Sequence, residues 1–302
     1  MDIKNIVTKG IKYCTDSDYR FAFNASRGKY NNMPDEEYLV KLFKAKLGYN
    51  LNLKNPATFN EKIQWLKLYD RNPIYTSMVD KYEAKNYVGK IIGFDHIINT
   101  IGVWNRFEDI DFEKLPERFV LKTTHGCGGI YICKDKAVFD KEKAANEINK
   151  TLCKNYYLYS REWPYKNVKP RVIAEEYIEE TEDELKDYKF FCFNGKAKVF
   201  KVDFDRFTDH FANYYDIEGN LMPFGEAQYP PRPDRMINLP SNLERMIELA
   251  EILSKNIRFL RVDFYNVNNR ILFGELTFSP DGGMGRFTSA DWDRTLGGWL
   301  VL

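Results

Sequence analysis

Two short segments near the C-terminal end of the sequence could bring carboxylates together. They are RVDF at 261–264 and ELTF at 275–278, and each alternates polar with apolar residues. Because successive side chains of a β-strand point to opposite faces, each segment is predicted to have one polar and one apolar face. If the strands pair as a hairpin with their apolar faces together, Asp263 lies opposite Glu275. This register needs an odd number of turn residues, which predicts a connection of three or five residues around 268–269.

The polar face of such a hairpin would suit a divalent cation. Two carboxylates placed opposite each other repel, and Mg²⁺ held by one or two carboxylates and by substrate phosphates removes that repulsion. Arg261 and Thr277 are predicted to lie opposite each other on the same face. The alternative is a solvated outer face with harmless charges, which is common in antiparallel sheets. A glycine-rich segment, SPDGGMGRF at 279–287, follows and is predicted to lie beside this face.

A second candidate site is the stretch FVLKTTHGCGGIYI at 119–132. Glycines let backbone N–H groups approach a phosphate closely, and a nearby lysine supplies positive charge. The spacing of a Walker P-loop is absent, the glycines do not open a helix, and the HRD and DFG motifs of protein kinases do not occur. The phosphate-binding loop that remains possible is a hairpin loop that folds over a nucleotide, with Lys122 extending toward it from the first strand. The alternative is a plain tight turn with an exposed lysine.

Helices in the first hundred residues and strands after residue 119 must position these groups. Thr58 and Glu61 have the spacing of a capping box, and a further helix is predicted from about Pro73 to Gly93.

Asn194-Gly195 between two alternating runs is the strongest hairpin signal in the chain, and SNLE at 241–244 predicts another capping box. The predicted class is α+β. The predicted parts are a helical-rich N-terminal domain (1–117), a small β-rich middle (118–180) and a C-terminal sheet domain (181–302).

Composition excludes several classes of protein. The 302 residues are 44% hydrophobic and 16% aromatic, which is typical of a folded chain with two or three lobes. A net charge of +1 gives no electrostatic argument for binding nucleic acid. Five widely spaced cysteines without a C-x-x-C favour a reducing, cytoplasmic environment. No run approaches 18 apolar residues, so we expect no integral membrane segment.

Several segments, in their order and spacing, form a recognisable series. They are FNEKIQWLKLYDRNP, VDKYEAKNYV, LPERFVLKTTHGCGG, VIAEEYIEE, DYKFFCFNGKAKVF, RVDFYNV and FGELTFSPDGG. From about Phe59 to the end, the sequence resembles the ATP-grasp superfamily, and within it the TupA-like group of teichuronopeptide and surface-polysaccharide biosynthesis. The resemblance implies the ATP-grasp fold, in which two α+β lobes hold ATP and Mg²⁺.

The resemblance also implies roles for particular residues. Those expected to bind ATP are Lys81, Lys122, the glycine loop with His125, Gly126, Gly128 and Gly129, the hinge Glu175, Glu176, Tyr177 and Ile178 beside adenine, and Asp187 on the ribose side. His125 has a plain structural role in the loop as its alternative. The metal residues are Asp263, Glu275 and Thr277. Thr277 stands where the family often has asparagine, which leaves a second metal open.

Arg261 is the residue that the resemblance implies for steadying the reaction intermediates. Lys189 is a further candidate for contacting phosphate, and the sequence does not distinguish it from Lys198 or Lys201.

The function implied is an ADP-forming ligase that joins a carboxylate to an amine through an acyl-phosphate. The leading substrates are a sugar carboxylate such as a hexuronic acid and an amino acid or small amine, in capsular or surface-polysaccharide biosynthesis. One alternative is a metal-dependent glycosyltransferase that uses Asp203 and Asp205 as a D-x-D motif, although strand alternation also explains both as solvent-facing. The other alternative is a non-catalytic nucleotide-binding protein.

Overall fold

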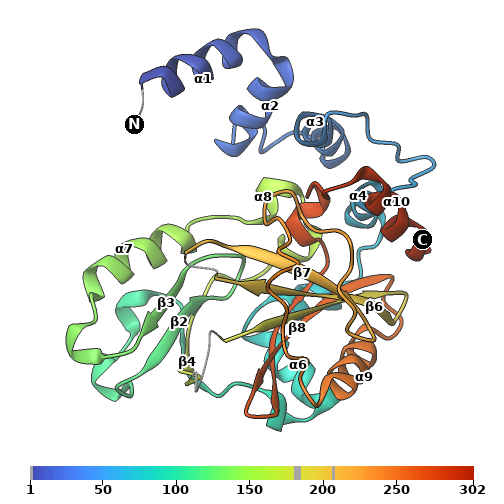
Figure 1. The fold of residues 1–302 in the computed structure, drawn as a ribbon. Helices are drawn as coiled ribbons and strands as arrows, with labels where there is room; N and C mark the ends of the chain where they lie inside the picture. The colour runs from blue at the N-terminus through green and yellow to red at the C-terminus, as the bar shows by residue number, and fades with distance from the viewer. Residues whose placement is uncertain (1–2, 180–184, 206–207) are drawn as a thin grey trace.

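The computed structural model describes residues 3–179, 185–205 and 208–302. Two antiparallel sheets lie beside each other, and the first three helices lie together at the top of the view in Figure 1. Within the described residues, none of the helices combines the length and the apolar composition needed to cross a membrane. The longer helices are α1 (Ile3–Thr15), α2 (Ser17–Ser26), α3 (Asp35–Leu47), α4 (Phe59–Tyr69), α5 (Ile74–Val79), α6 (Glu83–Ile92), α7 (Lys141–Leu152), α9 (Leu243–Ser254) and α10 (Ala290–Trp299).

The first sheet has four strands in the order β1-β4-β2-β3. They are β1 (Thr100–Trp104), β2 (Phe119–Thr123), β3 (Ile130–Cys133) and β4 (Val172–Glu176). Helix α7 packs Ala144 and Ile148 against the apolar side chains of β2 and β4. The glycine loop joins β2 to β3, as predicted. Strand β1 lies within the range 1–117 yet pairs with β4, and the predicted boundary at 180 lies outside the described residues.

The second sheet has five strands in the order β7-β6-β5-β8-β9. They are β5 (Asp187–Phe193), β6 (Lys196–Phe204), β7 (Phe211–Asp216), β8 (Phe259–Val267) and β9 (Arg270–Thr277). The hairpin predicted at Asn194-Gly195 is confirmed: this two-residue turn joins β5 to β6, and both residues have positive φ, as the turn requires.

The register of β8 and β9 is as predicted, but the turn is not. Asp263 pairs with Glu275. The connection has only two residues, Asn268 and Asn269, both with positive φ. A β-bulge after Asp263 adds Gly274 to β9 and restores the parity that a three-residue turn would have given. A Cβ at Gly274 would lie 3.1 Å from the carbonyl oxygen of Asp263, so the bulge is tight.

The two faces of the second sheet differ. On one face, Val262, Phe264 and Leu276 are buried in a core with α6 and α9, as the alternation predicts. The opposite face is divided along the strands. At one end its phenylalanines pack under α4 and α10, and at the other end charged side chains replace them. That charged end is the site described below.

Two predictions about the helices are wrong and one is confirmed. The capping box at Thr58 and Glu61 is present at the start of α4. The helix expected between Pro73 and Gly93 is broken into α5 and α6, because the carboxylate of Asp80 accepts hydrogen bonds from the backbone N–H groups of Tyr82, which precedes α6, and of Glu83, which begins it.

The capping box expected at 241–244 does not form. Helix α9 begins at Leu243 after Asn242, which makes no side-chain cap. The Ser241 hydroxyl instead donates to the side chain of Asn269, in the β8–β9 turn.

Candidate active site

One side of the site is built around a buried glutamate of the first sheet. Glu175 is 4% exposed, and its carboxylate oxygens lie 2.6 Å from Nζ of Lys85 and 2.5 Å from Nζ of Lys122. Burial alone would raise the pKa of Glu175, but the two lysines outweigh it and hold that pKa below its usual range. Two ammonium groups on one carboxylate leave a positive charge in excess, so the cluster can accept an anion such as phosphate.

Sequence analysis found Lys122 in this cluster but missed Lys85. Lys85 lies on α6 and also donates to the carbonyl oxygen of Ile98, at 2.6 Å. Its neighbours Ala84 and Val88 are buried with it. A lysine on the apolar side of an amphipathic helix is rare unless it is paired, and that pattern is the signal that could have identified it.

Lys81, in the segment between α5 and α6, is hydrogen-bonded to the glycine loop. Its backbone N–H donates to the carbonyl oxygen of Thr124, at 3.0 Å, and its ammonium group donates to the carbonyl oxygen of Gly126. In this arrangement Lys81 holds the loop, and its predicted contact with ATP stays a prediction.

The three glycines of the loop have different surroundings. Gly128 and Gly129 have positive φ. A Cβ at Gly129 would come within 2.6 Å of the Thr123 hydroxyl, and one at Gly126 within 2.8 Å of the Tyr156 ring. Nothing lies within 4 Å of the position that a Cβ would take at Gly128. Gly126 and Gly129 therefore permit close packing, whereas Gly128 leaves the tip of the loop open to a ligand.

His125 fixes the same loop to the C-terminal end of α7. Its Nε2 lies 3.1 Å from the carbonyl oxygens of both Thr151 and Lys154, so Nε2 carries the proton and donates. Burial lowers the pKa of His125. These contacts give the side chain a structural role, and the predicted contact with phosphate stays a prediction.

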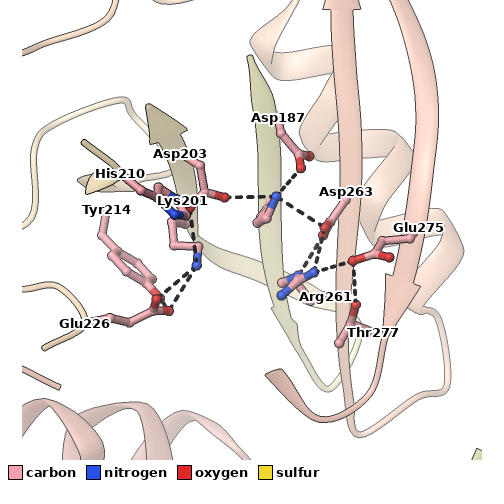
Figure 2. Close-up of polar contacts among 11 residues, drawn as sticks. Asp187, Lys201, Asp203, His210, Tyr214, Glu226, Arg261, Asp263, Glu275 and Thr277 are labelled. Carbon is pink, nitrogen blue, oxygen red and sulfur yellow. Dashed lines mark hydrogen bonds and ion pairs between the residues drawn. The ribbon is translucent and has the colours of Figure 1, made fainter. Parts of the chain in front are cut away.

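The charged end of the second sheet is centred on a guanidinium group. Figure 2 shows Arg261 between two carboxylates: it donates to both oxygens of Asp263, each at 2.7 Å, and to Oε1 of Glu275, at 2.8 Å. Thr277 lies beside Glu275, with its hydroxyl 3.5 Å from the same oxygen. Alternation thus predicted correctly that these four residues share one face.

The two carboxylates differ in how they could serve a cation. Asp263 is 1% exposed and both of its oxygens are taken by Arg261. The side chain of Glu275 is 42% exposed. Among the described residues no group of three or more His, Cys, Asp or Glu could hold a metal ion. The oxygen chemistry suits Mg²⁺, and Glu275 is the ligand that is open to it.

Buried lysines of β5 and β6 continue this charged face. Lys201 lies 3.1 Å from both oxygens of Glu226, which also accepts from the Tyr214 hydroxyl (Figure 2). Lys198 is exposed, so the structure separates it from the other two lysines. Lys189 forms ion pairs with three carboxylates, those of Asp187, Asp203 and Asp263.

A comparison with protein families matches residues 61–301 to the TupA-like ATP-grasp family. The chain belongs to the TupA-like ATP-grasp family. The resemblance seen in the sequence is therefore confirmed, and the two antiparallel sheets are the α+β lobes of an ATP-grasp fold.

Solved structures similar to this TupA-like chain include ligases. They include the D-alanine–D-alanine ligase of Bacillus anthracis (18% identity, 67% of this chain and 57% of that chain, TM-score 0.39). Others are a D-cycloserine synthetase (15%, 75% and 71%, TM-score 0.39) and the phosphoribosylamine–glycine ligase of Thermotoga maritima (14%, 68% and 48%, TM-score 0.41). The chain thus spans less than two thirds of the length of the first and third of these proteins. No curated protein is similar enough to count as a match.

A cavity of about 770 Å³ adjoins the charged face of this TupA-like protein. Gly126 and Cys127 of the glycine loop line it on one side, and Arg261, Glu275 and Thr277 on another. The second glycine-rich segment contributes residues 279–282 and 284–286, so it lies beside the charged face as predicted. The cavity therefore meets both the loop expected over ATP and the face expected to hold the metal.

Helices α2 and α3, which precede the matched residues, close the far wall of this cavity. Their contribution includes Ser26, Tyr38 and Lys46. Arg161 holds the connection between them: it is buried, has a positive φ, and donates to the carbonyl oxygens of Tyr30, Asn31 and Met33. Its guanidinium also lies 4.1 Å from the centre of the Tyr38 ring.

The predicted adenine hinge follows β4. Glu176 is exposed and its backbone N–H donates to the carbonyl oxygen of Asn99, at 3.1 Å. The Tyr177 ring lies 5.6 Å from the Arg118 guanidinium, and Ile178 is half-buried. Contacts of these residues with adenine, and of Asp187 with ribose, stay predictions.

Strand alternation predicted that both residues of the D-x-D pair face solvent, and this prediction is wrong for Asp203. Asp203 is buried, 3.0 Å from Lys189 and 2.9 Å from Nε2 of His210. Asp205 lies beyond the end of β6 with a positive φ. Lys201 lies 3.8 Å from the same carboxylate. The carboxylate of Asp203 is thus engaged by three partners of the protein itself, which argues against a glycosyltransferase metal site here.

Proposed function

We propose that this protein is an ATP-dependent carboxylate–amine ligase that works through an acyl-phosphate. The observation that carries the proposal is the position of Arg261. Its guanidinium lines the cavity together with the glycine loop, and it is held at Asp263 and Glu275 by three hydrogen bonds. A fixed cation at the junction of a nucleotide loop and a closed cavity suits a reaction in which negative charge develops on a transferring group.

The nucleotide is proposed to lie between the two sheets. The ammonium groups of Lys122 and Lys85 would give up part of their contact with Glu175 and bind the phosphates. The contacts with ATP that the resemblance implies are proposed as well for Lys81, the glycine loop, the hinge and Asp187. The three-part division at 117 and 180 belongs to the same proposal, with the second sheet forming the C-terminal lobe.

Mg²⁺ is proposed to bind at Glu275 and Thr277, where carboxylate and hydroxyl oxygens face the cavity. Asp263 would join them only if Arg261 released one of its oxygens. The ion supplies charge neutralisation on the transferring phosphoryl group when bound. Lys189, which carries three carboxylate partners, is proposed to keep this face close to neutral.

The reaction then needs no side-chain nucleophile. An oxygen of the substrate carboxylate attacks the γ-phosphorus, and ADP leaves. The amine nitrogen attacks the acyl carbon, a tetrahedral intermediate forms, and its C–O bond to phosphate breaks. Arg261 would stabilise the oxyanion of that intermediate.

The proposed carboxylate is that of a hexuronic-acid-type sugar, free or attached to a carrier, and the amine is an amino acid or small amine. The capsular and surface-polysaccharide role comes from the TupA-like resemblance, and we place the reaction in the cytoplasm. The size of the cavity is within the range for such ligands. Four tyrosines line it, at positions 38, 156, 159 and 165, and tyrosine offers both an apolar ring and a hydroxyl to a sugar.

The test incubates the protein with ATP, Mg²⁺, D-glucuronate and a pool of the twenty common amino acids, and identifies products by mass spectrometry. A ligase of this kind releases ADP and phosphate and forms an amide. AMP and pyrophosphate would indicate adenylation and contradict the acyl-phosphate. Glu275→Gln should lose turnover, and the exposed Lys198→Ala should retain it.

A thermal-shift measurement compares this function with its alternatives. ATP with Mg²⁺ should raise the melting temperature of a ligase, whereas stabilisation by a UDP-sugar with Mn²⁺ alone would favour the glycosyltransferase. A protein that binds ATP but forms no product with any carboxylate would be a nucleotide-binding protein.

A further inference from the structure

Glu162 is a buried carboxylate that faces the cavity without a cation of its own. It is 4% exposed and lines the cavity wall. One oxygen, Oε1, accepts from the Ser160 hydroxyl at 2.6 Å. In the part of the chain that the structure describes, no hydrogen bond reaches Oε2 and no cation forms an ion pair with the carboxylate. Burying an unpaired carboxylate lowers the stability of the fold, so such a group is usually paired with a cation or protonated.

The nearest cation, Lys67 of α4, is fully engaged elsewhere. Its ammonium group has three protons, and it donates to Oε1 of Gln64 and the carbonyl oxygen of Ser160, each at 2.9 Å, and to the carbonyl oxygen of Gly282. Lys67 therefore lowers the electrostatic cost of Glu162 from a distance but has no proton left to give it.

Arg261 is the other cation near Glu162, and it is engaged as well. It is bound to Asp263 and Glu275. The other ionisable neighbours of Glu162 in the cavity wall are Asp281 and the phenols of Tyr156 and Tyr165. None of these offers a positive charge.

Burial raises the pKa of Glu162, and the nearby carboxylate of Asp281 raises it further against the opposing effect of Lys67. Desolvation in the cavity wall and the carboxylate of Glu226 raise the pKa of Asp281 as well. This corner of the cavity is thus prepared for a positively charged group, which would restore the charge balance of Glu162.

We propose that Glu162 binds the amine substrate as its ammonium ion and then accepts the proton that makes it a nucleophile. The inference rests on the proposed function and assigns its amine side. In the step, one N–H proton of the ammonium passes to Oε2 of Glu162. The freed nitrogen lone pair forms the C–N bond, the bond from the acyl carbon to the phosphate oxygen breaks, and the departing phosphate takes the second proton that the nitrogen loses as it becomes an amide. Glu162 then returns its proton to solvent as the product leaves.

An ammonium group fits this corner better than a divalent metal ion. Only two carboxylates, Glu162 and Asp281, meet here, whereas Mg²⁺ requires a nearly octahedral set of oxygens. The rings of Tyr156 and Tyr165, with centroids 4.8 Å apart, line the same cavity. Aromatic rings add a favourable interaction with an organic ammonium ion.

Hydroxylamine separates the two halves of the reaction. It is mostly uncharged at neutral pH, so it can attack an acyl-phosphate without a base, and it gives a coloured hydroxamate. The experiment uses ATP, Mg²⁺ and D-glucuronate with either hydroxylamine or the pool of twenty amino acids supplemented with ethanolamine. The measured quantity is the ratio of amine-dependent to hydroxylamine-dependent turnover.

Glu162→Gln should lower this ratio about 100-fold, which is the lower end of the range for a general base. Glu162→Asp, which keeps a carboxylate one methylene further away, should lower it less. The matched control is Glu142→Gln, an exposed carboxylate on α7, which should keep the parent ratio. The melting temperature of each variant checks that it is folded.

The outcomes distinguish this inference from the proposed function. If the parent forms no hydroxamate from D-glucuronate, the proposed function fails on its carboxylate side. If the parent forms hydroxamate and Glu162→Gln keeps the parent ratio, or if no member of the amine pool is used, the assignment of Glu162 is wrong. Should Glu162→Gln not fold, Glu162→Asp decides: an unchanged ratio in that variant also overturns the assignment.

Discussion

Glu175 and Glu162 are equally buried, each 4% exposed, but their surroundings are opposite. Glu175 lies between two lysine ammonium groups, whereas Glu162 has one hydroxyl partner. As a result the pKa of Glu175 lies below its usual range and that of Glu162 lies above it. Burial alone therefore does not decide the charge state of a carboxylate.

The difference indicates what each region is prepared to bind. Around Glu175 the protein supplies more positive than negative charge, which an incoming phosphate can use. Around Glu162 it supplies a carboxylate and keeps its own cations occupied. The nucleotide side thus has positive charge in excess, and the amine side has a carboxylate without a cation of its own.

The largest expected effect comes from removing the lysines of the nucleotide side. Lys85→Met with Lys122→Met leaves Glu175 buried without a cation, and the free energy of unfolding should fall by about 3–5 kcal/mol. Adding Glu175→Gln should recover most of that loss. Glu162→Gln, measured in parallel, should change the free energy of unfolding by less than about 1 kcal/mol, since no ion pair is broken. A double variant as stable as the parent would contradict the comparison.

Single removal of Lys122 should act on ligand binding. Lys122→Ala loses one charge-assisted contact with phosphate, which is worth about 1.5–3 kcal/mol and weakens ATP binding roughly 10- to 150-fold. Calorimetric titration measures it, with Lys198→Ala as the control for loss of an exposed lysine. ATP binding equal to that of the parent would remove the glycine loop from the site.

The pH dependence of stability should have opposite signs in the two regions. Because the folded pKa of Glu175 is lowered, its ionised form stabilises the fold above the unfolded pKa, and this stability is lost as pH falls through the folded value. Glu175→Gln should therefore be less stable than the parent at pH 7, by about 1 kcal/mol, and should approach it in acid.

For Glu162 the sign reverses. Its folded pKa is raised, so its ionisation costs stability at pH values above the unfolded pKa. Glu162→Gln should be slightly more stable than the parent at pH 7, and the difference should vanish in acid, where both states are protonated. Melting curves from pH 4 to pH 8 measure both variants. Slopes of the same sign would mean that the two surroundings are alike.

The smallest effect should come from Ser160→Ala, which removes the single hydroxyl that donates to Glu162. Loss of one such hydrogen bond is worth about 0.5–1.5 kcal/mol. We expect the KM for the amine to rise roughly 2- to 12-fold and the KM for ATP to stay as in the parent. Steady-state kinetics would contradict the comparison if ATP were affected more than the amine.

Alternation predicted the charged face correctly because a slip of one residue would bury Glu275 in the apolar core. It could not predict the turn, since a two-residue turn with a bulge at Gly274 gives the same pairing as a three-residue turn without one. The break before α6 was missed for a similar reason. The other oxygen of Asp80 accepts from Arg171, 91 residues later in the sequence, and such a partner cannot be read from the local sequence.

The residues missed at the site depend on tertiary contacts. Lys85 of α6 and Glu175 of β4 are far apart in the sequence, and only the folded chain brings them together. Glu162 lies in an irregular segment between α8 (Tyr157–Ser160) and the short turn that starts at Trp163, where no periodicity marks a face. Its importance comes from Lys67 being occupied, which only the hydrogen bonds of the folded chain reveal.

The anchoring of α2 and α3 by Arg161 has a consequence for biosynthesis. Tyr30 leaves the ribosome 131 residues before the guanidinium that will hold it. At 5–20 residues per second this interval lasts roughly 7–26 s. During that time the ring of Tyr38 lacks its cation, and the connection between α2 and α3 lacks the guanidinium that holds it. The far wall of the cavity, although encoded first, is therefore completed only after the first sheet is largely synthesised.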